Sequence, residues 1–526
     1  MNWRAAILTA LAAAIVLQAG ASTPALASKT QEASLQDDTR LLADPPGTLD
    51  ELRRLGVQRV RVFVPWMAIA PGPRYPVRPP GFDATDPAQY PPANWSRWDS
   101  IVRDAAARGI GLDLTLTGGA PLWGLGPGAP GSTSQWDPSP SEFGAFVRAI
   151  ATRYDGRYVP PGSADPLPRV DHWGIWNEPN YGPHLAPQAF PGAGVEYSPR
   201  LYRNLLDHAW TALQGTGHGQ DTILFGELAP RGNSFLGVFS GTKPLRFLRE
   251  LYCVSSSYRP LRGATAGALG CPTTAAGSRL FRTAHAALFQ AAGFADHPYL
   301  QGSAPNAEPS GDPDYASLPQ LPHLERVLDR LQRVYGSGTR FPIYLTEFGY
   351  ITRPPRRSAS VSPALAAFYL NWAEYITWSD PRVRTLTQYL LTDPPPLGGS
   401  YGYGGFASGL TFHGGVHKAA YDAYRLPLYL PATTTGRGGS LEVWGCARPA
   451  IFGWLDDPNL PEQVQIQFGT GRRPRFATIR TVSITNPRGY FDQHVVFPSS
   501  GSVRLAWTYP GGSTVHSRVQ QITLGR

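Results

Sequence analysis

The sequence predicts two folded parts, a parallel α/β domain and a smaller all-β domain after it. Strand-like and helix-like segments alternate from about residue 33 to 430, which is the pattern of parallel strands joined by helices. Short β-prone runs separated by turn residues follow from residue 441 to 526 and are typical of a β-sandwich. The chain has 526 residues, 42% hydrophobic and 16% charged, so it can bury the cores of two such domains.

A leader precedes these domains. Arg4 is followed by a largely apolar run over residues 5–21, and Ala25-Leu26-Ala27 fits a small-x-small cleavage site. Residues 1–27 are therefore predicted to be a signal peptide that is cleaved before Ser28, which makes the protein secreted or extracytoplasmic. An uncleaved membrane anchor is the alternative, although the run is alanine-rich and marginal in length for a span. After cleavage no contact with a membrane is expected.

The α/β domain begins with its least strand-like segment. The first strand must lie near residues 33–42, where Gln36-Asp37-Asp38 is a poor strand sequence. The next elements are clearer, since helix 95–108 collects its apolar residues on one face and stops at Gly109. Ser139-Pro140-Ser141-Glu142 starts another helix with a capping serine, a proline in the first turn and a capping-box glutamate. The order expected is helix 48–55, strand 57–64, helix 95–108, strand 110–116, a helix from 139 and strand 172–175.

The second half continues the alternation. Ser198-Pro199 and Ser362-Pro363 each start a helix by the same capping chemistry. A long excursion that contains two cysteines separates the fifth strand from the sixth. The order expected is a helix from 198, strand 222–226, a sixth strand ending near 295–299, helix 324–335, strand 342–346, a helix from 362 to 378, strand 385–391 and helix 417–424.

The C-terminal part follows a stretch rich in threonine and glycine. Residues 431–440 are predicted to be a linker and residues 441–526 a β-sandwich. This module either binds carbohydrate or packs on the first domain, and its aromatic residues form no obvious planar set. The apolar run Arg448 to Trp454 is expected to dock on the first domain. The β-prone runs are 441–444, 464–468, 478–484, 494–497, 503–509 and 514–522.

Two apolar runs of the first domain end in a glutamate. One is the run Trp173 to Pro179, which contains Glu178, and the other is the run Ile343 to Phe348, which contains Glu347. A carboxylate at the end of a buried strand is costly unless it has partners or a function. Two such carboxylates are what the cleavage of a glycosidic bond requires, one as acid/base and one as nucleophile or base. A pair of structural ion-pairing carboxylates is the alternative.

The two motifs together resemble the clan A glycoside hydrolases, and families 5 and 39 most closely. The resemblance covers about residues 33–430 and implies a (β/α)8 TIM barrel, with Glu178 as the acid/base after strand four and Glu347 as the nucleophile after strand seven. The count of eight strands rests on this resemblance. By position, Asn177 resembles the asparagine that binds the sugar 2-hydroxyl. Arg61, His297 and Tyr299 resemble residues that bind substrate or hold the nucleophile.

Aromatic residues are expected to contact the sugar. The family often has a tryptophan at the end of strand eight, where this chain has Tyr389, so Tyr389 is expected to take its place. Trp66 and Trp123 are further stacking candidates, although each such aromatic is more often part of a core. The aromatic neighbours Trp173 and Trp176 are expected to raise the pKa of Glu178, as an acid needs.

Among the residues that the resemblance assigns to the site, Arg61 is also indicated by its position in a strand. It lies inside an apolar strand that is buried on both faces, so it must pair with a carboxylate, and Glu347 is the expected partner.

The cysteines and the charge restrict the other possibilities. Cys253 and Cys271 are expected to form a disulfide that shapes the cleft, with three reduced thiols as the alternative. The histidines are scattered and no Cys-x-x-Cys occurs, so neither a metal nor another cofactor is predicted. The net charge of +9 comes from dispersed arginines, which does not favour nucleic acid as a partner.

The predicted function is a secreted retaining glycoside hydrolase. It would cleave β-O-glycosidic bonds of poly- or oligosaccharides by double displacement with two glutamates. The alternatives are a catalytically inactive carbohydrate-binding protein and a cell-surface adhesion protein on a barrel scaffold. The sugar, the linkage and the oligomeric state are left open.

Overall fold

The computed structural model describes residues 30–131, 133–190, 195–307, 310–357, 360–397, 405–457 and 462–525. The predicted signal peptide lies outside these residues. Among the helices of the described part, none is long and apolar enough to cross a membrane.

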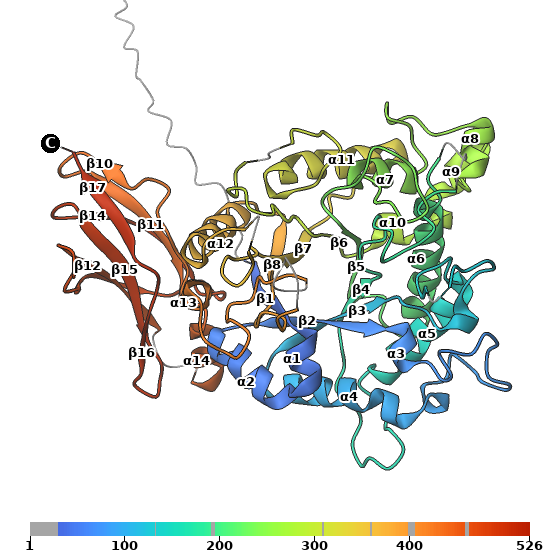
Figure 1. Ribbon diagram of the computed structural model, residues 1–526, viewed down its shortest axis with the longest axis horizontal. Coiled ribbons are helices and arrows are strands. Elements are labelled where there is room, and N and C mark those ends of the chain that lie inside the picture. The colour runs from blue at the N-terminus through green and yellow to red at the C-terminus, as the bar shows by residue number, and fades with distance from the viewer. Residues whose placement is uncertain are drawn as a thin grey trace, which may run out of the picture.

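Eight parallel strands close into a barrel in the order of the sequence, each hydrogen-bonded to the next and the last to the first (Figure 1). The predicted (β/α)8 fold is confirmed, and the weak first strand near residue 33 is the strand β1. The strands are β1 (Glu32–Gln36), β2 (Arg59–Pro65), β3 (Gly111–Thr117), β4 (His172–Ile175), β5 (Thr222–Leu228), β6 (Gly293–Asp296), β7 (Ile343–Phe348) and β8 (Val383–Tyr389).

Helices surround the barrel and begin where the sequence places their caps. The side chain of Ser139 accepts a hydrogen bond from the backbone N–H of Glu142, and Ser362 does the same for Leu365. The helices of this domain are α1 (Asp38–Ala43), α2 (Pro45–Leu55), α3 (Trp66–Ile69), α4 (Pro92–Ala107), α5 (Pro140–Arg153), α6 (Ser198–Gly215), α7 (Pro244–Leu251), α8 (Gly263–Ala268), α9 (Ala275–Ala284), α10 (Ala287–Gln290), α11 (Leu321–Val334), α12 (Pro363–Trp378) and α13 (Ala419–Arg425), with short 3-10 turns at Pro87–Gln89, Leu122–Gly124 and Leu318–Gln320.

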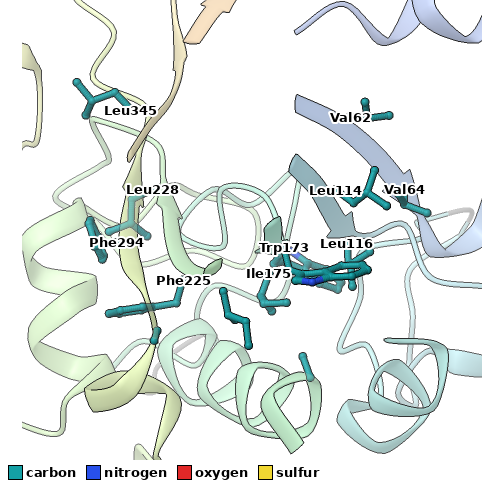
Figure 2. Packing of buried hydrophobic residues seen from close by; sticks show 14 of the residues in the cluster. Val62, Val64, Leu114, Leu116, Trp173, Ile175, Phe225, Leu228, Phe294 and Leu345 are labelled. Atoms are coloured by element: carbon teal, nitrogen blue, oxygen red, sulfur yellow. The ribbon is translucent and has the colours of Figure 1, made fainter. Parts of the chain in front are cut away.

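The strands alternate between an apolar outer face and a polar inner face. Figure 2 shows part of the outer layer, in which Val62 and Val64 of β2 belong to the same buried cluster as Leu114 and Leu116 of β3. Successive side chains of a strand point to opposite faces, so the residues between these, such as Arg61, point into the barrel. The interior of this barrel is therefore polar and holds buried charges.

The C-terminal part forms two β-sheets. One has the strand order β10-β17-β15-β12-β13 with β16 added to β15, and the other has the order β14-β11-β9. Apolar residues of both sheets share one core, as a sandwich requires. The elements are β9 (Leu428–Tyr429), β10 (Thr434–Thr435), β11 (Ser440–Cys446), α14 (Ala450–Asp456), β12 (Gln463–Gly469), β13 (Ala477–Ser483), β14 (Tyr490–Val496), β15 (Gly501–Thr508), β16 (Thr514–His516) and β17 (Gln520–Leu524).

The boundary between the two domains lies earlier than the sequence suggests. Strand β9 precedes the predicted linker and pairs with β11, and β10 lies within the linker and pairs with β17. Backbone hydrogen bonds thus hold the stretch 431–440 against the sandwich, and the sandwich begins at Leu428.

The sandwich docks on the barrel beside α12 and α13 (Figure 1). The predicted docking run is in this contact, because Phe452 joins the core cluster of the barrel and Arg448 forms a buried ion pair with Glu374 of α12. Trp444, Tyr490 and Trp507 are buried, which agrees with a packing role for these aromatic residues.

The disulfide between Cys253 and Cys271 is present. Its loop lies outside the barrel, where Arg203 of α6 donates hydrogen bonds to the carbonyl oxygens of Leu251 and Leu269. The expectation that this loop shapes the cleft is therefore wrong. The hydroxyl of Tyr335, at the C-terminal end of α11, donates to the carbonyl oxygen of Tyr252 beside the first cysteine. The helices of a (β/α)8 barrel run back from the carboxyl ends of the strands, so the bridge lies away from those ends.

Candidate active site

Three of the predicted site residues lie at the carboxyl ends of the strands. Glu178 follows β4, Glu347 lies at the end of β7, and His297 directly follows β6. Trp176 and Glu178 have positive φ angles of 70° and 43°, a conformation that costs a non-glycine residue of order 1–3 kcal/mol. Such outliers are concentrated at functional sites, and here they direct the Glu178 side chain over the barrel.

Arg61 is the buried centre of the site. It is fully inaccessible to solvent, and Nη1 lies 2.6 Å from Glu347 Oε1 while Nη2 lies 2.9 Å from Glu227 Oε2. Nη2 also donates to Asn177 Oδ1 at 3.0 Å. Burial alone would lower the pKa of Arg61, but the charges of Glu227 and Glu347 raise it. The arginine thus remains a cation that balances two carboxylates. The sequence predicted its pairing with Glu347 but not with Glu227.

Glu347 is held on both oxygens. Arg61 contacts Oε1, and the hydroxyl of Tyr299 donates to Oε2 at 3.0 Å. These two contacts fix the direction of the carboxylate. This is the arrangement that a nucleophilic carboxylate needs.

His297 connects three carboxylates. Its Nδ1 lies 3.0 Å from Glu178 Oε1 and 3.8 Å from Glu347 Oε2, and its Nε2 lies 3.0 Å from Glu227 Oε2. Burial would lower the pKa of His297, but the charge of Glu347 and the hydrogen bonds with Glu178 and Glu227 raise it to about 10. The ring therefore carries a positive charge at neutral pH.

One carboxylate oxygen of Glu178, one of Glu347 and a ring nitrogen of His297 all lie within 4.8 Å of one another. Three such groups can bind a cation when the imidazole is neutral. Here both ring nitrogens face carboxylate oxygens and the ring is protonated, so the arrangement is a hydrogen-bonded network of charges.

The surroundings of Glu178 differ from those expected. Trp173 donates to Asp221 on the outside of the barrel, and Trp176 packs on Phe143 of α5. The partners of Glu178 are instead His184 and His297, each at 3.0 Å. Burial raises the pKa of Glu178, but the hydrogen bonds from these two histidines lower it to about 2. The prediction of a raised pKa is wrong for this state of the site.

The aromatic candidates divide into core and surface. Trp66 is fully buried among Trp123, Phe143 and Phe146, which corrects its assignment as a stacking residue. The short helix α3 begins at Trp66 and turns its ring away from the strand ends. Trp123 is half-buried in the same cluster, and its contact with a sugar remains a prediction.

Tyr389 lies near Glu347, together with an aromatic residue that the sequence did not indicate. Phe406, in the connection after β8, has its ring 5.7 Å from Tyr389 and 5.1 Å from Tyr299. Its side chain is 41% exposed, so it presents an open aromatic face beside the candidate site.

Glu227 and His184 were missed by sequence reasoning. Glu227 lies near the end of the apolar strand Thr222–Leu228, as the other two glutamates lie near the ends of theirs. The sequence predicted that this strand ends at Gly226, so Glu227 was not assigned to the site. His184 lies in the loop after Glu178, where its sequence context gives no signal.

The chain matches no family model and no curated protein. Among solved structures it is similar to a family 39 glycoside hydrolase from Bacteroides cellulosilyticus WH2, with 14% identity, a TM-score of 0.46 and coverage of 89% of this chain and 80% of that one. It is also similar to an endo-β-1,4-mannanase from Thermotoga petrophila, with 10% identity, a TM-score of 0.41 and coverage of 95% and 99%. A family 1 β-glucosidase from Thermotoga maritima gives 13% identity, a TM-score of 0.45 and coverage of 74% and 85%. Likeness at this level carries no functional conclusion.

Proposed function

We propose that the protein is a retaining glycoside hydrolase of the clan A type. The observation that carries the proposal is the approach of Glu178 and Glu347, whose carboxylate oxygens lie within 4.8 Å of each other at the carboxyl end of a parallel barrel. Retaining enzymes hold their two carboxyl groups roughly 5 to 5.5 Å apart, and inverting enzymes leave room for a water at roughly 6.5 to 9.5 Å.

The two glutamates have different surroundings and so different roles. Glu347, held by Arg61 and Tyr299, attacks the anomeric carbon and forms a covalent glycosyl intermediate. Glu178 gives a proton to the leaving oxygen in the first step and takes one from water in the second. Asn177, which is fixed by Arg61, is placed to bind a hydroxyl group of the sugar.

The substrate class is a β-linked poly- or oligosaccharide. Phe406 and Tyr389 border the nucleophile and offer aromatic faces, which suit the apolar face of a pyranose ring. The disulfide in the described part agrees with an exported protein, and we propose that residues 1–27 direct secretion.

A panel of aryl β-glycosides tests the proposal. The wild type should hydrolyse at least one member of the panel, and Glu347→Gln should abolish turnover while the protein stays folded. Glu178→Ala should retain its first step on substrates with good leaving groups, because these need little protonation. Added azide should then restore turnover of Glu178→Ala and give a β-glycosyl azide.

The two alternatives predict other outcomes. A wild type that binds glycans but hydrolyses no member of the panel would be an inactive carbohydrate-binding protein. A wild type that does neither would fit an adhesion role of the barrel scaffold. Equal loss of activity in both glutamate variants without rescue by azide would contradict the assigned roles.

A further inference from the structure

Glu227 is a third carboxylate of the site, and the two-glutamate mechanism does not require it. Along β5, Ile223 and Phe225 face the helices, so strict alternation would send Glu227 to the same side. The pairing of β5 with β6 shifts its register between Gly226 and Leu228, and Glu227 has a φ of 52°. A bulge of this kind re-aims a side chain, and here it turns the carboxylate into the barrel.

A backbone hydrogen bond and a close contact with Gly174 hold Glu227 in its inward position. Its backbone carbonyl accepts a hydrogen bond from the N–H of Glu178 at 2.8 Å, so the two glutamates are joined through the main chain. Its Oε1 lies against Gly174 of β4, where a Cβ would approach to 2.7 Å. Only a glycine at this position leaves room for the carboxylate.

Glu227 is ionised in this position. Its Oε2 accepts hydrogen bonds from Arg61 Nη2 at 2.9 Å and from the hydroxyl of Thr346 at 2.6 Å, and it faces His297 Nε2 at 3.0 Å. Burial raises the pKa of Glu227, but the charge of Arg61 and the hydrogen bonds of His297 and Thr346 bring it below its ordinary value. Arg61 and Thr346 donate to this oxygen whatever the tautomer of His297, and two such donors favour the ionised carboxylate.

The contact with Glu227 consequently fixes a proton on Nε2 of His297. An ionised Glu227 requires a proton on Nε2, since a carboxylate only accepts hydrogen bonds. Nδ1, on the other side of the ring, faces Glu178 Oε1 at 3.0 Å. The proton between Nδ1 and Glu178 is then the one that can move.

We infer that Glu227 is a positioning residue that fixes the tautomer of His297, so that His297 and Glu178 share the proton delivered to the leaving group. This inference rests on the proposed function. In the first step the shared proton passes from Nδ1 to Glu178 and from Glu178 to the leaving oxygen, while Glu347 bonds to the anomeric carbon and the bond to the leaving oxygen breaks. Glu178 then remains as a carboxylate and His297 as a neutral ring with its proton on Nε2. In the second step a water attacks the anomeric carbon, the bond to Glu347 breaks, and the water gives its proton to this pair, which restores the first state.

The charge around His297 determines the pH range over which the pair keeps this proton. The ring is faced by Glu178 after β4, Glu227 of β5, Asp296 of β6 and Glu347 of β7, with His184 in contact with Glu178. Behind these lie Arg61 of β2 and Asp113 of β3.

Burial raises the pKa of Asp296 well above its ordinary value, so Asp296 adds little negative charge. Burial together with the charge of Glu227 raises the pKa of Asp113 to about 6, so Asp113 is ionised on the alkaline limb. The carboxylates that raise the pKa of His297 are those of Glu347, Glu178 and Glu227. Removing the charge of Glu227 therefore removes one of three nearby carboxylates that hold the proton on His297.

The pH dependence of kcat/KM tests this inference. In Glu227→Gln the alkaline limb of the profile should move to lower pH by about one unit or more, because the proton is held less tightly without the carboxylate. Thr346→Val is the matched control, since it removes a hydrogen bond to the same oxygen but keeps the charge. Its alkaline limb should stay within a few tenths of a unit of the wild type. A Glu227→Gln variant that loses activity with an unmoved alkaline limb would show a merely structural role.

A second measurement follows the proton on His297 directly and does not depend on activity. NMR of the wild type with 15N-labelled histidine gives one set of signals for each histidine, and the set that is missing in His297→Gln belongs to His297. These signals should report a proton on Nε2 at pH 7. Their titration midpoint should lie well above that of a free histidine. The midpoint should fall by about one unit or more in Glu227→Gln. A neutral His297 with its proton on Nδ1 in an active wild type would overturn the inference alone. An inactive wild type with a protonated His297 would overturn the proposed function and leave the pairing of Glu227 with His297.

Discussion

Arg61 and Glu347 form an ion pair inside the barrel, with 2.6 Å between Nη1 and Oε1. The same guanidinium contacts Glu227, so a single cation balances two carboxylates that come from different strands. Buried charges need such compensation, because each ion loses the solvation that water provides. The position of Glu347 and the stability of the barrel therefore depend on one side chain.

Arg61→Met should destabilise the protein strongly. The variant leaves Glu227 and Glu347 in the interior without their cation, and breaking a buried pair from one side costs about 3 to 5 kcal/mol. The free energy of unfolding in urea at pH 7 measures this loss. Adding Glu227→Gln to Arg61→Met should recover part of the loss, because one uncompensated charge is gone. A double variant that is less stable than the single one would contradict this account.

Stability should be highest between about pH 4.5 and 6.5. The pKa of Glu178 is lowered from 4.5 to about 2, so its stabilising contribution is complete above pH 4.5 and is lost as the pH falls toward 2. The pKa of His297 is raised from 6.5 to about 10, so its contribution is complete below pH 6.5 and is lost as the pH rises through 10. Thermal midpoints measured from about pH 2 to about pH 11 report both limbs. His297→Gln should flatten the alkaline limb, and an unchanged alkaline slope would show that another group causes it.

Replacing both cysteines of the disulfide should lower stability without changing catalysis. The bridge joins residues 18 apart in sequence, and a loop of that size stabilises by about 3 kcal/mol in the chain-entropy model. Its loop packs beside α6 outside the barrel, so the double variant Cys253→Ser/Cys271→Ser should have the kcat/KM of the wild type below its unfolding temperature. A changed kcat/KM in the folded variant would show that the loop reaches the site after all.

The sequence allowed part of the site to be predicted, because some of its residues stand out locally. Glu178 and Glu347 each end an apolar run, and Arg61 interrupts one, so their burial and pairing could be inferred from strand alternation. Glu227 could not be placed in this way. Its inward direction depends on a bulge between β5 and β6, which reverses the alternation and leaves no mark in the sequence of β5.

The sequence also did not predict contacts between side chains that lie far apart along the chain. The pKa of Glu178 depends on His184 and His297, whereas its neighbours in sequence, Trp173 and Trp176, face other parts of the molecule. Trp66 follows the end of β2 as an exposed stacking residue would, but a single turn of helix places it in the core. Both errors concern where a side chain points, which the order of residues alone does not determine.

Phe406→Ala should weaken substrate binding. Phe406 is 41% exposed and lies beside Tyr299, which donates to Glu347. Loss of a stacking face should raise KM with a smaller effect on kcat, since stacking acts on the bound sugar before and during the reaction. Val416→Ala is the control, because Val416 is an exposed apolar residue of the same connection. A KM equal to that of the wild type would remove Phe406 from the substrate site.

The last prediction concerns the contact between the domains, where Glu374 of α12 lies beneath the sandwich. Arg448 Nη2 lies 2.8 Å and 2.7 Å from its two oxygens, and the hydroxyl of Tyr490 donates to Oε1 at 2.9 Å. Around this polar centre the ring of Trp378 contacts that of Trp444. Removal of the sandwich would uncover the aromatic face of α12 and leave Glu374 without its cation.

A chain that ends near Pro431 should therefore aggregate or unfold at a lower temperature, although the proposed catalytic residues all lie in the barrel. Variants of the full chain separate the ion pair from the apolar contact. Arg448→Met alone should cost about 3 to 5 kcal/mol, because Glu374 stays buried and unpaired. Arg448→Met combined with Glu374→Gln should cost less, since neither charge is then uncompensated. Unfolding free energies of the two variants decide this, and a truncated chain that stays monomeric with the thermal midpoint of the full protein would show that the sandwich is an independent module.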